Sequence, residues 1–254
     1  MWLPAEPNTL LADDNWVFTG HADSGRVGVL DVSEGREPKL VRVLDIFPDG
    51  VNGFARQMGS SWYYLVSRNS ARIYPFDLTM PSRQAGEGPA VSTGPAIQIG
   101  SNSPGNDCRS IAFSPDGTRA FVTNRQPPSV VVLDMTLRTD GTPAGTNLAT
   151  IELGRGPSKL VVQPLPDGSY LVLVVCFDAE EIFVVDPVTM AIVDVFKTGA
   201  GPHALVPAPA TGRAYLANFG ESTVWVLDFS SRSSPNFARP ILSIGTPEIP
   251  SGHG

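Results

Sequence analysis

Five copies of one pattern run along the chain, and this repeat constrains the fold more than any other feature. Each copy has two short apolar segments separated by a turn, followed by a third apolar segment that ends in aspartate. The pattern is clearest over 109–134, 158–186 and 203–228, and degenerate over 8–31 and 54–77. Spacings of 46, 57, 52 and 42 residues separate the final aspartates, which are Asp31, Asp77, Asp134, Asp186 and Asp228. Periods of this size, with four short strands per unit, are typical of β-propeller blades.

The repeat predicts one all-β domain of four-stranded antiparallel blades. The blades are expected at about 5–48, 50–100, 105–154, 155–199 and 200–245, with 246–254 as a tail or the lead-in to a further blade. One such domain can use all 254 residues. The 25 glycines and 24 prolines suit a fold with many tight turns, and no segment has a convincing helical period.

The third unit shows the expected strand order best. Its innermost strand is expected at 110–113, followed by a Pro-Asp-Gly hairpin turn at 115–117 in which glycine supplies the positive φ. Residues 130–133 are almost purely β-branched, which indicates a strand buried on both faces. The same phase places the next inner strands near 159–163 and 203–207.

The charge and hydropathy of the chain exclude several classes of partner. A net charge of −7, with no basic stripe to neutralise phosphates, argues against nucleic acid and against an anionic membrane surface. No run approaches the roughly 18 apolar residues of a membrane span. Residues 1–7 show neither the basic nor the apolar segment of an export signal. The expected partner is a protein or a small-molecule ligand.

A sequence signature recurs within the units. Ser-Pro-Asp-Gly at 114–117, Phe-Val-Thr-Asn at 121–124 and Val-Leu-Asp at 132–134 return as Tyr-Leu-Ala-Asn at 215–218 and Val-Leu-Asp at 226–228. These units resemble the YVTN-type β-propeller repeats found in lactonase-like and surface-layer-associated proteins. The resemblance is strong over 105–245 and weak over 1–100. It specifies the fold better than the activity, because the same repeat serves enzymes, binding proteins and scaffolds.

The resemblance implies about seven blades, whereas the chain contains five units. Two interpretations stay open: a closed five-bladed ring, or part of a larger, seven-bladed propeller. Each unit begins at its inner strand and ends at its outer strand, so no spare strand is left to close a ring. We favour the larger propeller, because an open arc leaves two unpaired blade faces through which chains would associate.

The topology of a four-stranded meander places the candidate binding residues. The loops between second and third strands share one rim with the connections between blades, around the mouth of the central channel where a propeller ligand usually binds. Seven polar residues are expected on this rim: Asn52, Arg109, Asn124, Ser158, Asp178, His203 and Asn218. The recurring aspartates lie on the opposite rim with the insertions 79–95 and 136–146, and are expected to form structural Asx turns.

Structural roles compete with ligand binding at several of these positions. His203 either fixes the start of its strand through a hydrogen bond or binds a ligand. Asn124 and Asn218 are expected to satisfy backbone groups of their loops. Asp178 belongs either to a solvated acidic loop or to a cation site. Arg109 pairs either with a nearby aspartate or with the carboxylate of a ligand.

The sequence identifies no cofactor. None of the three histidines pair at metal-ligand spacing. His21 occupies the same strand position as Asn124, so it is expected on the rim with Asp178 and His203, and these three are the candidates for a Ca²⁺ or Zn²⁺ site. The favoured expectation is that no metal is bound.

The two cysteines map to the same rim on adjacent blades. Cys108 begins an inner strand and Cys176 ends a second strand, so a disulfide between them is sterically possible. Two free, buried thiols are the favoured alternative. Oxidation to a disulfide would indicate an extracytoplasmic location.

Two classes of function stay open. The favoured one is a non-catalytic binding or scaffold module of the periplasm, the cell surface or the extracellular space. The alternative is a lactonase-like or quinoprotein-like enzyme with a metal-assisted site at the central channel. The resemblance implies several acidic or histidine ligands around the channel of a lactonase, whereas this rim carries mostly asparagine, serine and one arginine. This composition favours binding.

Overall fold

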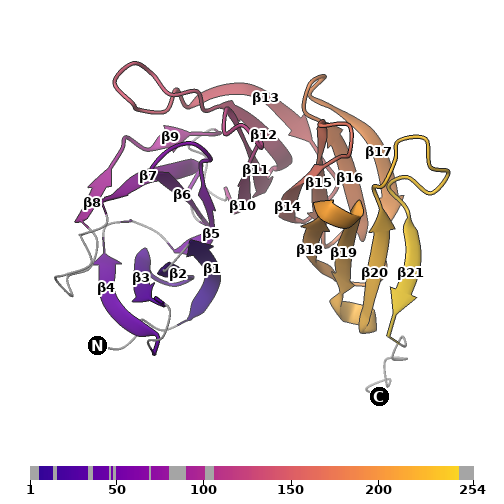
Figure 1. The fold of residues 1–254 in the computed structure, drawn as a ribbon, viewed down its shortest axis with the longest axis horizontal. Helices are drawn as coiled ribbons and strands as arrows, with labels where there is room; N and C mark the ends of the chain where they lie inside the picture. The colour runs from indigo at the N-terminus through magenta and orange to yellow at the C-terminus, as the bar shows by residue number, and fades with distance from the viewer. Residues whose placement is uncertain are drawn as a thin grey trace.

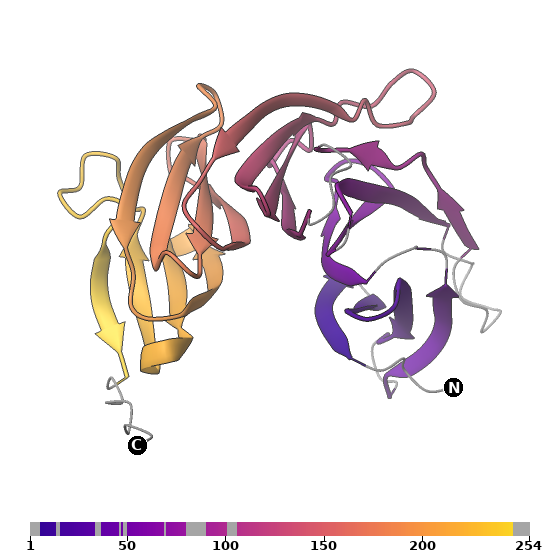
Figure 2. The same ribbon diagram turned by 180° about the vertical axis from the view of Figure 1, so that it is seen from behind.

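The structure is a computed structural model that describes residues 6–13, 16–33, 37–45, 47, 50–68, 70–79, 90–100 and 106–245. These residues form five antiparallel sheets that follow one another along an arc, with the first and last blades lying apart at its two ends (Figures 1 and 2). Within the described residues there is no α-helix, and none of the helical segments could cross a membrane. The expected all-β fold of four-stranded antiparallel blades is confirmed.

The strands of each blade run from the channel outward in chain order. Blade one contains β1 (Pro7–Asp13), β2 (Trp16–His21), β3 (Arg26–Asp31) and β4 (Lys39–Asp45). Blade two contains β5 (Val51–Arg56), β6 (Trp62–Ser67), β7 (Arg72–Thr79) and an outer strand in two pieces, β8 (Ala90–Thr93) and β9 (Ile97–Gln98), which both pair with β7. Blade three contains β10 (Cys108–Phe113), β11 (Arg119–Arg125), β12 (Pro128–Asp134) and β13 (Thr146–Glu152).

The last two blades complete the arc. Blade four contains β14 (Pro157–Pro164), β15 (Tyr170–Cys176), β16 (Glu181–Asp186) and β17 (Ala191–Lys197). Blade five contains β18 (Pro202–Ala208), β19 (Arg213–Asn218), β20 (Thr223–Asp228) and β21 (Pro240–Ile244), with the 3-10 turns η1 (Pro209–Thr211) and η2 (Phe219–Glu221) between strands. The inner strands expected near 110–113, 159–163 and 203–207 are therefore confirmed. The expected lead-in at 246–254 and most of the insertion 79–95 lie outside the described residues.

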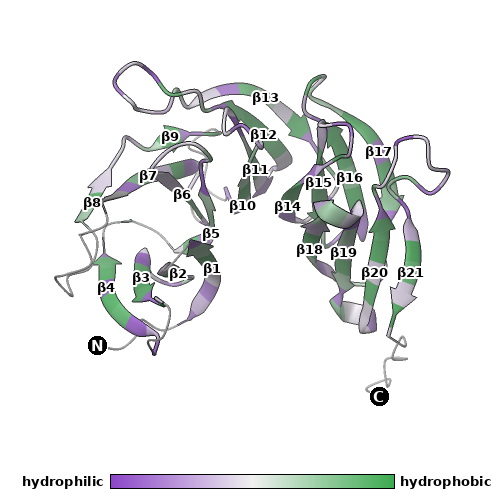
Figure 3. Cartoon of the chain, in the orientation of Figure 1, coloured by the Kyte–Doolittle hydropathy of each residue, from purple (hydrophilic) through white to green (hydrophobic). Residues whose placement is uncertain are grey.

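The hydrophobic core consists of the interfaces between consecutive blades. In β12, Val130 and Val132 pack against blade four, and the alternate residues Val131 and Leu133 pack against blade two. All four are buried, which confirms the strand buried on both faces. Burial of each such side chain stabilises the fold by about 1.5–3 kcal/mol. Figure 3 shows the same hydrophobic colouring along the central strands of neighbouring blades.

The hairpin turn of blade three shows why the Pro-Asp-Gly signature ends in glycine. Gly117 has a φ of +70° and donates its N–H to the carbonyl oxygen of Ser114 at 2.9 Å. A Cβ at this position would lie 2.4 Å from the carbonyl oxygen of Met58 in blade two. Any other residue would therefore strain both the turn and the contact between the two blades.

Aspartates at the ends of third strands form the expected Asx turns. In each case a side-chain oxygen accepts a hydrogen bond of 2.7 to 3.0 Å from the backbone N–H two residues further on. The four aspartates with this bond are Asp31, Asp134, Asp186 and Asp228. The structural role is confirmed for these four, and it stays a prediction for the fifth, Asp77.

Blade five has one face packed on blade four and a second face that points away from it. This second face carries apolar side chains like those between blades, but no blade lies beside it in the structure. Val206 pairs with Tyr215 and Val226 pairs with Leu242, so these side chains share the face opposite the contact with blade four. Val206 and Leu242 are each more than half exposed, and so is Ile244. An apolar face of this kind is normally covered in a soluble protein.

We expect the purified chain to self-associate through this face. Replacing Val206 and Leu242 by glutamate should lower the mass measured by sizing chromatography with light scattering, because charged side chains would be trapped in the contact. Val188→Glu, on an exposed turn of blade four, is the control and should leave association unchanged. A wild-type chain that stays monomeric at high concentration would contradict this expectation.

Candidate functional site

Each inner strand begins with a bulge that aims one polar side chain into the channel. The pairing with the second strand skips one residue at the same place in all five blades. The skipped residues are Asn8, Asn52, Arg109, Ser158 and His203. Bulges of this kind re-aim a side chain away from the regular sheet. All five side chains line one cavity.

The cavity lies on the concave side of the arc, where the inner strands face one another (Figure 1). Its volume is about 340 Å³, which suits a ligand of one or two rings. Four further residues line it: Thr9, Arg125, Lys159 and Phe177. Residues from all five blades thus meet at a single mouth of the channel.

Three cationic side chains converge on this mouth from blades three and four. Arg109 bonds to Asp107 at 2.5 Å, and Arg125 donates to both oxygens of Asp178 at 2.8 and 2.9 Å. Lys159 has no ion pair with any residue that the structure describes. The Nε–H of Arg109 is buried and has no acceptor within the same described part of the chain. The Arg109 side chain as a whole is partly exposed and lines the cavity.

The neutral side chains of the mouth are ordered by contacts between neighbouring blades. Asn8 donates to the side-chain oxygen of Asn52 at 3.2 Å, and Asn52 donates to the carbonyl oxygen of Cys108 at 2.9 Å. The His203 ring meets the ring of Phe177 edge-on, at 6.4 Å between centroids and an angle of 88°. The mouth therefore offers oriented amides and an imidazole beside its cations.

The structure brings four of the seven expected rim residues into the cavity lining: Asn52, Arg109, Ser158 and His203. Asp178 lies beside the mouth through its bonds to Arg125. Asn124 and Asn218 do not line the cavity. Asn124 is buried and accepts the N–H of Asp107 at 3.0 Å, and Asn218 is buried and donates to Thr223 at 3.2 Å. Asn124 also accepts the N–H of Gln126 in its own loop at 3.3 Å, as expected, whereas Asn218 bonds to a side chain and its Oδ1 has no partner within the described structure.

Sequence reasoning missed five residues that line the cavity. Asn8 was detectable, because it begins the first copy of the repeat and corresponds to Asn52 in the second. Lys159 directly follows the rim residue Ser158, and the bulge brings both to the mouth. No local signal marked Arg125 or Phe177, which reach the mouth from the ends of second strands.

Comparison with solved structures identifies the fold. A putative 6-phosphogluconolactonase from Bacteroides uniformis matches with a TM-score of 0.73 and 17% identity, over 96% of this chain and 72% of that chain. The periplasmic gluconolactonase of Pseudomonas aeruginosa matches with a TM-score of 0.65 and 18% identity, over 92% of this chain and 68% of that one. The fold is that of the lactonase-like β-propellers. No model of a protein family and no curated protein sequence matches the chain, so its YVTN character stays a resemblance.

These neighbours correct the expected function. The sequence favoured a non-catalytic binding or scaffold module, and this preference was wrong: both neighbours are named as lactonases, which was the alternative. The error arose from expecting acidic metal ligands around the channel of any such enzyme. At this level of identity the neighbours show the fold alone, and the chemistry of this chain has to be argued from its own residues.

The donors at the mouth of this propeller do not fit a metal. The three candidate ligands do not come together as one set. His21 is buried, hydrogen-bonds to Thr19 at 2.9 Å and does not line the cavity. Asp178 is bound by Arg125, and His203 stands among cations. The described residues include no group of three histidine, cysteine or acidic side chains suited to a metal ion.

Cys108 and Cys176 are free, buried thiols in the structure, so the disulfide considered from the sequence is not formed. Cys108 donates to the carbonyl oxygen of Ser70 at 3.3 Å. Burial raises the pKa of each thiol to about 12, and nearby carboxylates act in the same direction. Neither cysteine is therefore a reactive thiolate near neutral pH.

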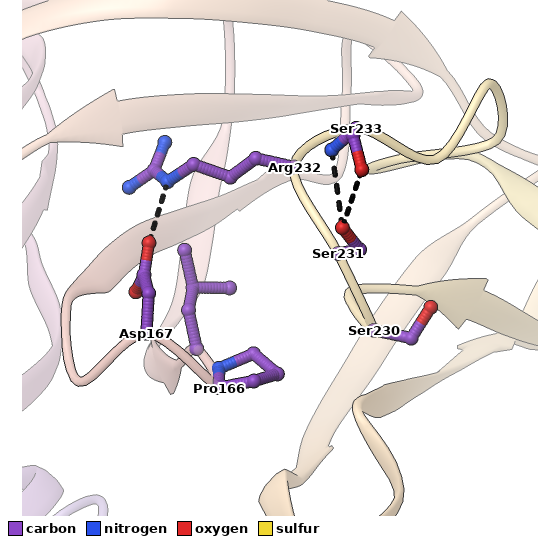
Figure 4. A pocket seen from close by; sticks show the side chains of 7 residues that line it. Pro166, Asp167, Ser230, Ser231, Arg232 and Ser233 are labelled. Carbon is purple, nitrogen blue, oxygen red and sulfur yellow. Dashed lines mark hydrogen bonds and ion pairs between the residues drawn. The ribbon is translucent and has the colours of Figure 1, made fainter.

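A second cavity, of about 290 Å³, lies on the opposite rim between blades four and five. Arg232 reaches across it toward Asp167 at 3.4 Å, and the hydroxyls of Ser231 and Ser233 bond to each other at 2.8 Å (Figure 4). These polar groups already satisfy one another. At the channel mouth, by contrast, Lys159 has no ion pair among the described residues and side chains from five blades line one cavity, so the mouth is the better candidate for a ligand site.

Proposed function

We propose that the chain is a lactone hydrolase of the periplasm or cell surface that opens sugar-derived lactones at the channel mouth. One observation carries the proposal: five bulged side chains, one of which is Arg109, converge with Arg125 and Lys159 on one cavity of about 340 Å³. The names of the two structural neighbours support this class of substrate. The periplasmic location in the name of the second supports the location.

The cations suit the charge that develops when a lactone is opened. Water attacks the carbonyl carbon, and negative charge gathers on the carbonyl oxygen. The Arg109 side chain is partly exposed and lines the cavity, and a fixed guanidinium donor stabilises an oxyanion far better than bulk water does. Ring opening then yields a carboxylate, which the cationic mouth also accommodates.

The neutral groups of the mouth suit a polyhydroxylated ring. Asn8, Asn52 and Ser158 come from three different blades and present amide and hydroxyl groups to one space. Groups of this kind select a ligand by hydrogen bonds to its hydroxyls, because an apolar analogue would leave them unpaired. Phe177 offers an apolar edge against which a sugar ring packs.

The proposal is tested by following acid release from glucono-δ-lactone, its 6-phosphate and an unsubstituted δ-lactone in a pH-stat. The wild-type chain should accelerate opening of the sugar lactones above the spontaneous rate, and a chelator should leave the rate unchanged because the donor set does not fit a metal. Heat-denatured protein gives the background. Hydrolysis no faster than this background for all three lactones would refute the proposal.

A further inference from the structure

Lys159 lines the mouth of the channel without an ion pair to any described residue. It follows the bulged Ser158 on β14, the inner strand of blade four, and it lines the cavity. Arg109 and Arg125, the other cations of the mouth, each bind an aspartate. Among the residues that the structure describes, no carboxylate is ion-paired with Lys159. Its amine is thus not committed to another side chain.

The surroundings of Lys159 shift its protonation equilibrium toward the amine, relative to a fully hydrated lysine. Its side chain is exposed to the cavity, yet the strands around it remove part of its hydration and lower the pKa of its ammonium. The strands packed against β14 are β10, β11, β15 and β18. Their charged and titratable groups are Cys108, Arg109, Arg119, Arg125, Tyr170, Cys176 and His203, with Asp107 and Asp178 in the adjoining loops. Both of these aspartates are bound to arginines.

We propose that Lys159, as a neutral amine, is the general base that activates water for attack on the lactone; this inference rests on the proposed lactone hydrolysis. The amine Nζ takes a proton from water as the water oxygen bonds to the carbonyl carbon, and the C=O electron pair moves to the oxygen. When the tetrahedral intermediate collapses, the ring C–O bond breaks and the leaving oxygen takes the proton from the Lys159 ammonium. The products are the hydroxy acid and the neutral amine.

The other groups at the mouth are less suited to this step. Arginines stay protonated and cannot act as bases. Asp107 and Asp178 are held by guanidinium groups. His203 lies one blade further from Arg109, since β14 is the strand that contacts both β10 and β18. A base and an oxyanion donor must both reach one carbonyl carbon, and Lys159 and Arg109 stand on neighbouring inner strands.

The kinetic test compares Lys159→Met and Lys159→Arg with the wild type on glucono-δ-lactone. Both variants should lose about 10²- to 10⁴-fold in kcat, because general-base catalysis contributes that much and arginine cannot replace a neutral amine. The wild-type rate should rise with pH and then level off, and both variants should lose this dependence. Lys197→Met, an exposed lysine on the outer strand β17, should stay within about twofold.

Activity retained in Lys159→Met, or restored in Lys159→Arg, would overturn the base assignment while leaving lactone hydrolysis intact. Loss in His203→Ala with activity retained in Lys159→Met would transfer the role to His203. A wild-type chain that does not open lactones would refute the proposed function and this step with it.

A second measurement does not depend on turnover. Competitive acetylation of the wild-type chain, read by mass spectrometry between about pH 6 and pH 11, gives the pKa of each lysine amine. Lys159 should titrate at lower pH than Lys197. A pKa of Lys159 equal to or above that of Lys197 would overturn the proposal even if the chain hydrolyses lactones.

Discussion

Gln57→Leu is expected to lower the free energy of unfolding by about 3 kcal/mol, the scale of a broken buried network. The side chain of Gln57 is 3% exposed and joins blades two and three. Its Nε2 donates to the carbonyl oxygens of Gly117 and Met135 at 2.8 and 2.7 Å, and its Oε1 accepts from Tyr64 at 2.6 Å. Leucine has nearly the same volume but leaves three buried polar groups without partners.

Urea denaturation of the wild type and the variant measures this difference. Gln98→Leu is the matched control, because Gln98 is exposed and hydrogen-bonds at the surface; it should change stability by less than about 0.5 kcal/mol. Tyr64→Phe removes one of the three bonds and should cost about 1 to 1.5 kcal/mol. Equal midpoints for the Gln57 variant and the wild type would show that water replaces the amide without loss.

Arg109→Met is expected to reduce kcat/KM for a sugar lactone by about 10²- to 10³-fold, the usual effect of removing an oxyanion donor. Arg109 is the bulged residue of the central blade, and its partly exposed side chain lines the cavity. Arg109→Lys keeps the charge but not the planar donor, so it should recover only part of the loss.

Initial rates in a pH-stat give kcat/KM for both Arg109 variants, and circular dichroism shows whether the variants remain folded. Arg232→Met on the opposite rim is the control and should keep the wild-type rate. Equal losses in Arg109→Met and Arg232→Met would show that neither effect is specific to the mouth.

The fold could be predicted from the sequence because every blade repeats the same order of short apolar strands and tight turns. A run such as 130–133 has to be buried on both faces, and the Pro-Asp-Gly turn fixes where the strand before it ends. Blade two kept the fold without the signature: Gly59 in Met-Gly-Ser-Ser still provides a positive φ of +73° at the turn. Blade two therefore forms its strands by the alternation of buried and exposed side chains, although it lacks the Pro-Asp-Gly motif.

The candidate site could be predicted only in part, because the bulges decide which side chains face the channel. Asn124 and Asn218 have a strand position suited to the rim, but their buried amides bond to Asp107, just before β10, and to Thr223, the first residue of β20. Arg125 carries no repeat signal and reaches the mouth through its pair with Asp178 on the next blade. A contact of this kind between two blades depends on how the two sheets are placed relative to each other. The sequence of a single repeat does not encode that placement.

The central claim is that the five bulged residues form one ligand site, and hydrogen exchange tests it most directly. Deuterium uptake of the full chain, with and without a saturating concentration of gluconate, would be followed by mass spectrometry. Binding at the mouth should slow exchange around residues 8, 52, 109, 158 and 203 together, while the opposite rim at 165–169 and 229–234 stays unchanged. Protection confined to that opposite rim would contradict the account.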